Sequence, residues 1–203
     1  MRAAQNAKII LLATFAAIAY GILHDQITAG LCVEYFTIGH PPLFHTTSPT
    51  VLGICWGMAA TFGLGALLGL ILALVSQSEG MPPVPIRRLF NSIVALLAVM
   101  AISASLAGVI GFALSRRSII CVPAAFAELI PRSRQDRFMT VWFVHWASYL
   151  VGLIGASFII VRIWRARGRP RVVSIFPHTK AGVIRALILA VVAALVAWFR
   201  FAK

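Results

Sequence analysis

The chain has 203 residues, of which 61% are hydrophobic and 11% are charged. An average soluble protein is roughly 45–50% apolar and about 25% charged. A soluble domain of this size leaves about a third of its chain surface in water, which is too much for such an apolar composition. Disordered chains are also excluded, because they require low hydrophobicity. The composition predicts an all-α integral membrane protein that crosses the bilayer several times.

The formal net charge is +13, from 18 lysine and arginine residues against 5 aspartate and glutamate residues. In a soluble protein this balance would indicate a nucleic-acid partner. Here the arginines stand in short segments beside apolar runs, where basic residues set membrane topology and contact anionic lipid headgroups. We therefore expect the lipid bilayer as a partner and no nucleic acid.

Apolar runs of about 20 residues are long enough to cross a bilayer. The chain contains five such runs, at residues 9–23, 51–75, 93–114, 140–163 and 183–199. Arg185 stands one turn inside the last of these runs, where its long side chain can reach the membrane interface. We expect a single domain over residues 1–203, built as a bundle of about five transmembrane helices.

The first run also has features of a secretory signal peptide. It follows Arg2 and Lys8, and it contains the small-residue sequence Ala17-Ile18-Ala19. The apolar run continues beyond this sequence to Leu23, which favours an uncleaved helix. Cleavage would leave four transmembrane helices, and this alternative stays open.

The distribution of basic residues predicts the orientation in the membrane. Residues 24–50 contain no lysine or arginine, whereas residues 162–180 contain six. Because basic loops stay in the cytoplasm, we expect a cytoplasmic N-terminus with residues 24–50 outside. One loop conflicts with this topology, since it would place five arginines outside: Arg116, Arg117, Arg132, Arg134 and Arg137.

Small residues recur four apart in two of the predicted helices. The first contains the pairs Gly53/Gly57 and Gly65/Gly69, and the other contains Ser148, Gly152 and Ala156 in a row. Such spacing lets helix backbones approach closely in lipid. It predicts a compact bundle, and it fits a homo-oligomer or a subunit of a larger membrane complex.

Most of the groups that could bind a metal or a proton fall on one side of the membrane in this topology. Of the five acidic residues and five histidines, Glu79 and His178 are the exceptions. The others are His24, Asp25, Glu34, His40, His45, Glu128, Asp136 and His145. A polar cluster on one side of an otherwise apolar protein indicates a functional site.

Within this group we select a candidate metal site. Imidazole and carboxylate ligands suit Zn, Fe or Mn. His145 is a notable member, because an ionisable group inside a span usually faces the bundle and has a partner. The candidate ligands are His24, Asp25, Glu34, His40, His45 and His145. Their spacing matches no standard ligand motif, so ordinary polar residues at the membrane surface remain the alternative.

The three cysteines, Cys32, Cys55 and Cys121, have no metal-finger spacing. Cys55 lies in an apolar run and is most simply a small buried residue. Cys32 and Cys121 fall in loops on the same predicted side, which leaves a disulfide between them as an open alternative.

The sequence YGILHDQITAGLCVEYFTIGHP, residues 20–41, resembles an N-terminal signature of an uncharacterised bacterial polytopic membrane protein family, written YG-HDQIT-EYFT. The resemblance implies a multi-pass protein of the bacterial inner membrane. It supplies no catalytic residues, but it covers His24, Asp25 and Glu34.

The sequence leaves three functions open and does not show whether the chain is an enzyme. The favoured interpretation is a small accessory or structural membrane subunit. The alternative is a membrane-embedded metal-binding or redox protein with its site at the outer face. Transport of a proton or small solute is the weakest, because apart from Arg162 at the edge of its span the predicted spans contain only Arg185 and His145 among the lysines, arginines, histidines and acidic residues.

Overall fold

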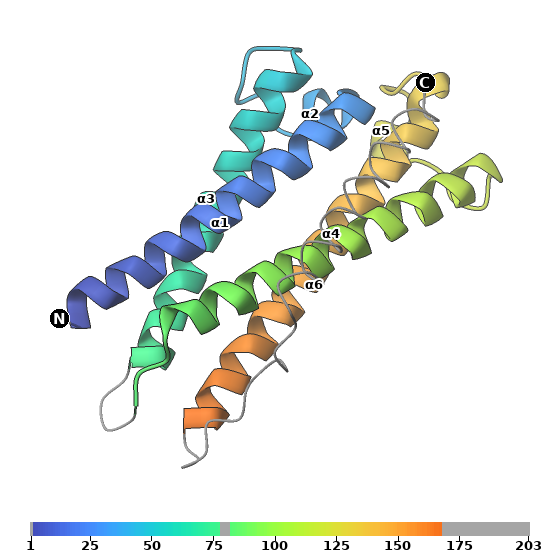
Figure 1. The fold of residues 1–203 in the computed structure, drawn as a ribbon. Coiled ribbons are helices and arrows are strands. Elements are labelled where there is room, and N and C mark those ends of the chain that lie inside the picture. Colours follow the sequence, from blue (N-terminus) through green and yellow to red (C-terminus); the bar gives the residue numbers. More distant parts are fainter. Residues whose placement is uncertain (1, 78–81, 168–203) are drawn as a thin grey trace.

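The structure is a computed structural model that describes residues 2–77 and 82–167. In these residues the chain forms helices and no strands, which confirms the all-α prediction. Four long helices run up, down, up and down (Figure 1), and two short helices, α2 and α5, lie at one end of the molecule. The elements are α1 (Arg2–Leu31), α2 (Glu34–Thr37), α3 (Pro49–Gln77), α4 (Ile86–Arg116), α5 (Ala124–Ala127) and α6 (Arg132–Arg167).

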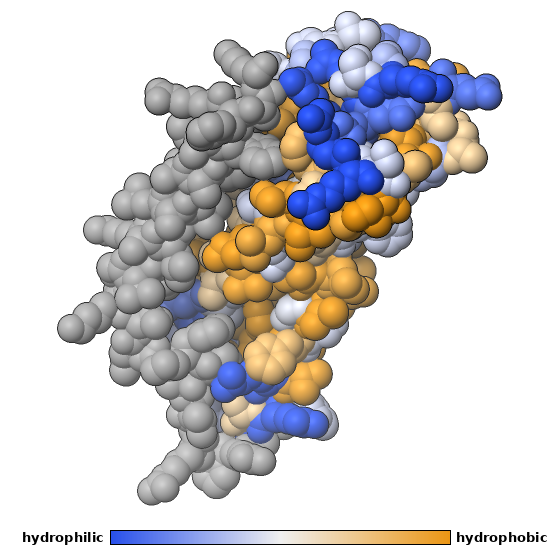
Figure 2. Space-filling model, turned by 90° about the vertical axis from the view of Figure 1, so that its right-hand side faces the viewer, coloured by the Kyte–Doolittle hydropathy of each residue, from blue (hydrophilic) through white to orange (hydrophobic). Residues whose placement is uncertain are grey.

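The four long helices are long and apolar enough to cross a membrane. Helix α1, with 30 residues, spans about 45 Å, against a hydrocarbon thickness of about 30 Å. Figure 2 shows a hydrophobic band between two hydrophilic ends, the pattern of a protein that stands in a bilayer. The chain is therefore a multi-pass integral membrane protein. The fifth predicted span, residues 183–199, lies outside the described residues.

The helices extend beyond the predicted apolar runs, which corrects the predicted bounds. The first run was predicted to end at residue 23, but α1 continues to Leu31, which puts His24 and Asp25 inside the helix. The fourth run was predicted to begin at residue 140, whereas α6 begins at Arg132 and places His145 more than three turns in. In both helices polar residues at the membrane surface continue the helical hydrogen bonding, so hydropathy alone predicts spans that are too short.

Helices α1 and α3 pack with their backbones in contact along a glycine stripe formed by Gly53, Gly57, Gly65 and Gly69. A Cβ atom added at Gly57 would lie 2.6 Å from the carbonyl oxygen of Gly21 in α1. One added at Gly53 would lie 2.9 Å from the backbone oxygen of Asp25. Because only glycine permits this approach, the stripe holds α3 directly against the part of α1 that carries Asp25.

Helices α4 and α6 form the second pair, and two apolar clusters join it to the first. One cluster packs Ile9 of α1 and Leu72 of α3 against Ile163 of α6. The other lies toward the short helices and packs Tyr35 and Phe36 with residues at the start of α6. Three polar side chains, His24 and Asp25 of α1 and His145 of α6, meet between these two clusters. A polar site therefore lies inside the bundle.

Candidate metal centre

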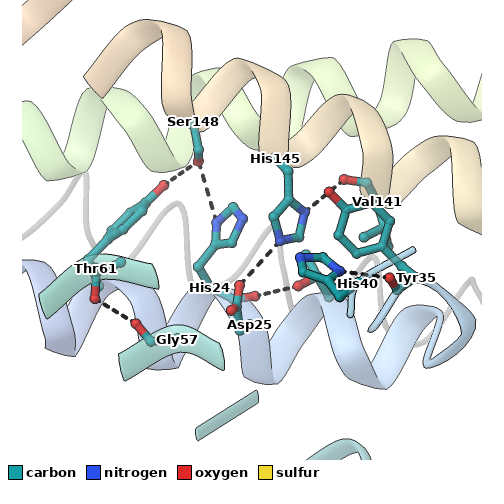
Figure 3. Close-up of polar contacts among 11 residues, drawn as sticks. His24, Asp25, Tyr35, His40, Gly57, Thr61, Val141, His145 and Ser148 are labelled. Atoms are coloured by element: carbon teal, nitrogen blue, oxygen red, sulfur yellow. Dashed lines mark hydrogen bonds and ion pairs between the residues drawn. The ribbon is translucent and has the colours of Figure 1, made fainter. Parts of the chain in front are cut away.

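Three of the predicted ligands meet where α1 faces α6. His24 and Asp25 come from α1 and His145 comes from α6 (Figure 3). One ligand atom from each residue lies within 4.8 Å of the others. Bonds of about 2 Å to a metal keep its ligands within about 4 Å of each other, so a shift of about 1 Å would close this site.

The hydrogen bonding of His145 determines which of its nitrogens carries hydrogen. Nδ1 lies 2.9 Å from the backbone oxygen of Val141. A carbonyl oxygen can only accept, so Nδ1 is the donor. In the neutral ring Nε2 then has a lone pair, and it lies 3.3 Å from Oδ1 of Asp25. Two acceptor atoms at this separation require a cation between them, either a proton or a metal ion.

The ring of His24 is also held in position, in its case by contacts with side chains. Its Nδ1 lies 3.5 Å from Oγ of Ser148, which in turn lies 2.7 Å from the hydroxyl of Tyr20. The Nε2 atom of His24 is buried and has no hydrogen-bond partner. If Nδ1–H donates to Ser148, Nε2 presents a second lone pair to the site. Metal-binding histidines usually have their other ring nitrogen fixed by such a donor bond.

The surroundings of the site are buried and aromatic. The side chains of His145 and Asp25 are 3% and 9% exposed. The ring centroids of Tyr35 and Phe36 lie 4.5 Å and 5.8 Å from that of His145. The ring of His24 stands edge-on to His145, with 4.7 Å between centroids. An unbalanced charge would be strongly disfavoured here, so a carboxylate at this depth needs a cationic partner.

The other three predicted ligands lie outside this group of three. Glu34 forms an ion pair with Arg134, whose Nε lies 3.3 Å from Oε1. His40 lies in the loop after α2, where its Nδ1 is 2.9 Å from the backbone oxygen of Tyr35. His45 is exposed in the same loop. The chain turns where α1 ends at Leu31, and all three residues lie beyond that turn.

His40 belongs to the aromatic group that covers the site. Its ring stacks on Phe36 and lies 4.6 Å, between centroids, from the ring of Trp56 in α3. Burial lowers the pKa of His40, although the carbonyl of Tyr35 opposes this effect. The same burial raises the pKa of the Tyr35 hydroxyl. Both groups are therefore neutral near pH 7, which suits a packing role.

Polar contacts also join side chains at the end of the bundle that carries α2 and α5. The Cys32 thiol donates to Oε2 of Glu34 at 3.3 Å, and burial together with this contact raises its pKa to about 12. Asp136 accepts from the Ser115 hydroxyl at 2.7 Å and pairs with Arg116. Cys32 and Cys121 are free thiols, so the structure contains no disulfide between them.

Two contributors to the site were missed by the sequence analysis. Tyr20 and Ser148 are ordinary residues of apolar helices, and only their contact across the bundle shows that they hold His24. Ser148 was assigned to a small-residue stripe, which explains its position on the inner face of α6.

Comparisons of the chain with protein families, curated proteins and solved structures find no match.

Proposed function

We propose that this integral membrane protein binds a divalent transition-metal ion between His24, Asp25 and His145. One observation carries the proposal: Nε2 of His145 and Oδ1 of Asp25, both acceptors when the ring is neutral, face each other at 3.3 Å in a buried setting. The partnerless Nε2 of His24 adds a third donor to the metal.

The donor set limits the choice of metal. Two imidazole nitrogens and one carboxylate oxygen suit Zn, Fe or Mn, and the hard all-oxygen sites of Mg and Ca differ from them. A metal ion held here would act as a Lewis acid or as a redox centre. The nearby aromatic side chains would exclude water, so that the charge of the metal ion is less screened.

The experiment is elemental analysis of protein purified in detergent, before and after dialysis against Zn, Mn and anaerobic ferrous salts. We expect close to one ion per chain in the wild type and none in the His145→Ala variant. His45→Ala is the matched control, because His45 is exposed and lies outside the site, and it should bind like the wild type. Wild-type protein that takes up none of these ions would contradict the proposal and leave a proton between Asp25 and His145.

A second candidate is the accessory or structural membrane subunit. It is supported by the short connections of the described residues, which leave little chain outside the helices for a soluble catalytic domain. This function would bring the protein into a homo-oligomer or a larger complex. Gentle solubilisation and native size analysis of membranes test it, since a species much larger than one 22.0 kDa chain is expected.

We also propose a cytoplasmic N-terminus, as in a bacterial inner membrane protein. The segment between α1 and α3 has no basic residue. In the described chain seven basic residues lie toward the end that holds the N-terminus, namely Arg2, Lys8, Arg87, Arg88, Arg162, Arg165 and Arg167. Five lie toward the other end, and two of these, Arg116 and Arg134, pair with acidic side chains. This asymmetry supports the orientation.

A further inference from the structure

We infer that the metal ion in this site keeps coordination positions open and binds a small uncharged diatomic molecule of the dioxygen or nitric oxide class. The inference rests on the proposed function, and it adds the chemical class of the ligand. It follows from the number of donors, the walls of the site and the medium around it.

The number of donors is the first argument. Among the residues that the structure describes, only His24, Asp25 and His145 form a group able to hold a metal. Structural zinc sites have four protein ligands, whereas three protein ligands leave a position for an exogenous one. Two histidines and one carboxylate with open positions are the ligand set of non-haem ferrous centres that bind oxygen. A six-coordinate ferrous ion here would have open positions.

The walls are the second argument. The side chains that contact the imidazole of His145 are largely aromatic: Tyr35, Phe36 and Tyr149 lie with ring centroids 4.5 Å, 5.8 Å and 5.9 Å from it. Tyr20, which could otherwise supply an oxygen, is hydrogen-bonded to Ser148. The site is therefore walled largely by aromatic rings, and such a surrounding favours an uncharged ligand over a charged one.

The medium is the third argument. His145 lies about two turns beyond the polar start of α6, residues 132–137, and its side chain is only 3% exposed. Charged or bulky solutes must cross both the helix packing and the low-dielectric bilayer to reach it. Small uncharged molecules dissolve in hydrocarbon and reach the site from the membrane itself. The position of the site therefore favours small uncharged ligands, as the aromatic side chains around it do.

The test uses full-length protein in detergent, loaded anaerobically with ferrous ion and then exposed to nitric oxide. The amount of bound iron is measured first. We expect electron paramagnetic resonance to show the spin-3/2 signal of a ferrous nitrosyl centre at close to one per bound iron. His45→Ala should give the same signal, and His24→Ala should lose it. Circular dichroism confirms that this variant is still helical.

Several outcomes would overturn the inference. Iron bound at one per chain without a nitrosyl signal means that the coordination is closed, while the proposed function stands. A signal that appears only in Tyr35→Phe means that the Tyr35 hydroxyl fills the open position. An equally strong optical response to azide would contradict the preference for uncharged ligands. Protein that binds no iron fails the proposed function instead, so the two failures are distinguishable.

Discussion

Nε2 of His145 lies 3.3 Å from Oδ1 of Asp25, and this contact joins α6 to α1 across the centre of the bundle. Because Nδ1 of His145 donates to the carbonyl of Val141, the contact needs a cation or a hydrogen atom between its two acceptors. The packing of α6 against α1 therefore depends on the cation or hydrogen atom that lies between His145 and Asp25.

The first prediction concerns Asp25 in metal-free protein. Asp25→Asn should unfold at close to the wild-type denaturant concentration, because its amide N–H can donate to Nε2 of His145. Asp25→Leu has a similar size but no donor, and the unpaired buried nitrogen should lower the unfolding free energy by about 1–3 kcal/mol. Denaturant titration in detergent measures both variants. Equal losses in the two would mean that Nε2 is not the acceptor.

The second prediction is that Ser148 positions His24 for metal binding. Removing the hydroxyl in Ser148→Ala leaves His24 Nδ1 without its contact, and metal affinity should fall roughly 10–100-fold. Ser105→Ala is the control, since that hydroxyl bonds to Ala101 within α4. Competition with a chelator of known affinity reports the change. If both variants bind metal as tightly as the wild type does, Ser148 has no positioning role.

The third prediction tests the glycine stripe. Gly57→Ala places a methyl group 2.6 Å from the backbone of Gly21 and should destabilise the fold by about 1–3 kcal/mol. Gly63→Ala, in the same helix, has nothing within 4 Å of the new methyl group and should be neutral or slightly stabilising. Thermal unfolding in detergent separates them. A tolerant Gly57 would mean that α1 and α3 do not touch there.

The fourth prediction concerns pH. Because burial lowers the pKa of His40, the unfolded chain takes up a proton on acidification before the folded protein does. Stability should therefore decrease as the pH falls below about 6.5, the usual histidine value. His40→Asn should lose less stability than the wild type between about pH 8 and pH 5. Asp25 and His145, which also act on His40, remain unchanged in this comparison. An identical pH dependence would show that His40 is already solvated.

The fifth prediction is the orientation. Reporter fusions after His45 and after Arg167 should lie on opposite sides of the membrane, with the first outside. The reason is the lack of basic residues between α1 and α3 compared with the arginines at the end of α6. Both fusions on one side would contradict the number of crossings between them.

Hydropathy predicted the four described helices, because a bilayer imposes their length and composition. The predicted spans were too short, since Gln26 and Arg132 are helical although they are polar. The choice of imidazole and carboxylate groups on one side of the membrane put His145 in one candidate site with His24 and Asp25, and these three lie together in the structure. The separate locations of Glu34 and His45 were not predictable, because they depend on how the chain turns after Leu31. Nor was the Tyr20–Ser148 contact, which needs the relative rotation of α1 and α6.

The close backbone contact of α1 with α3 has a consequence for the order of assembly. Two neighbouring helices that fit together through glycine can associate in the membrane as a hairpin before the rest of the chain has been inserted. That hairpin would already carry His24 and Asp25, but His145 arrives only with α6. The proposed metal site is then completed only when α6 joins this hairpin, so an occupied site would mark a chain in which α6 has packed against α1.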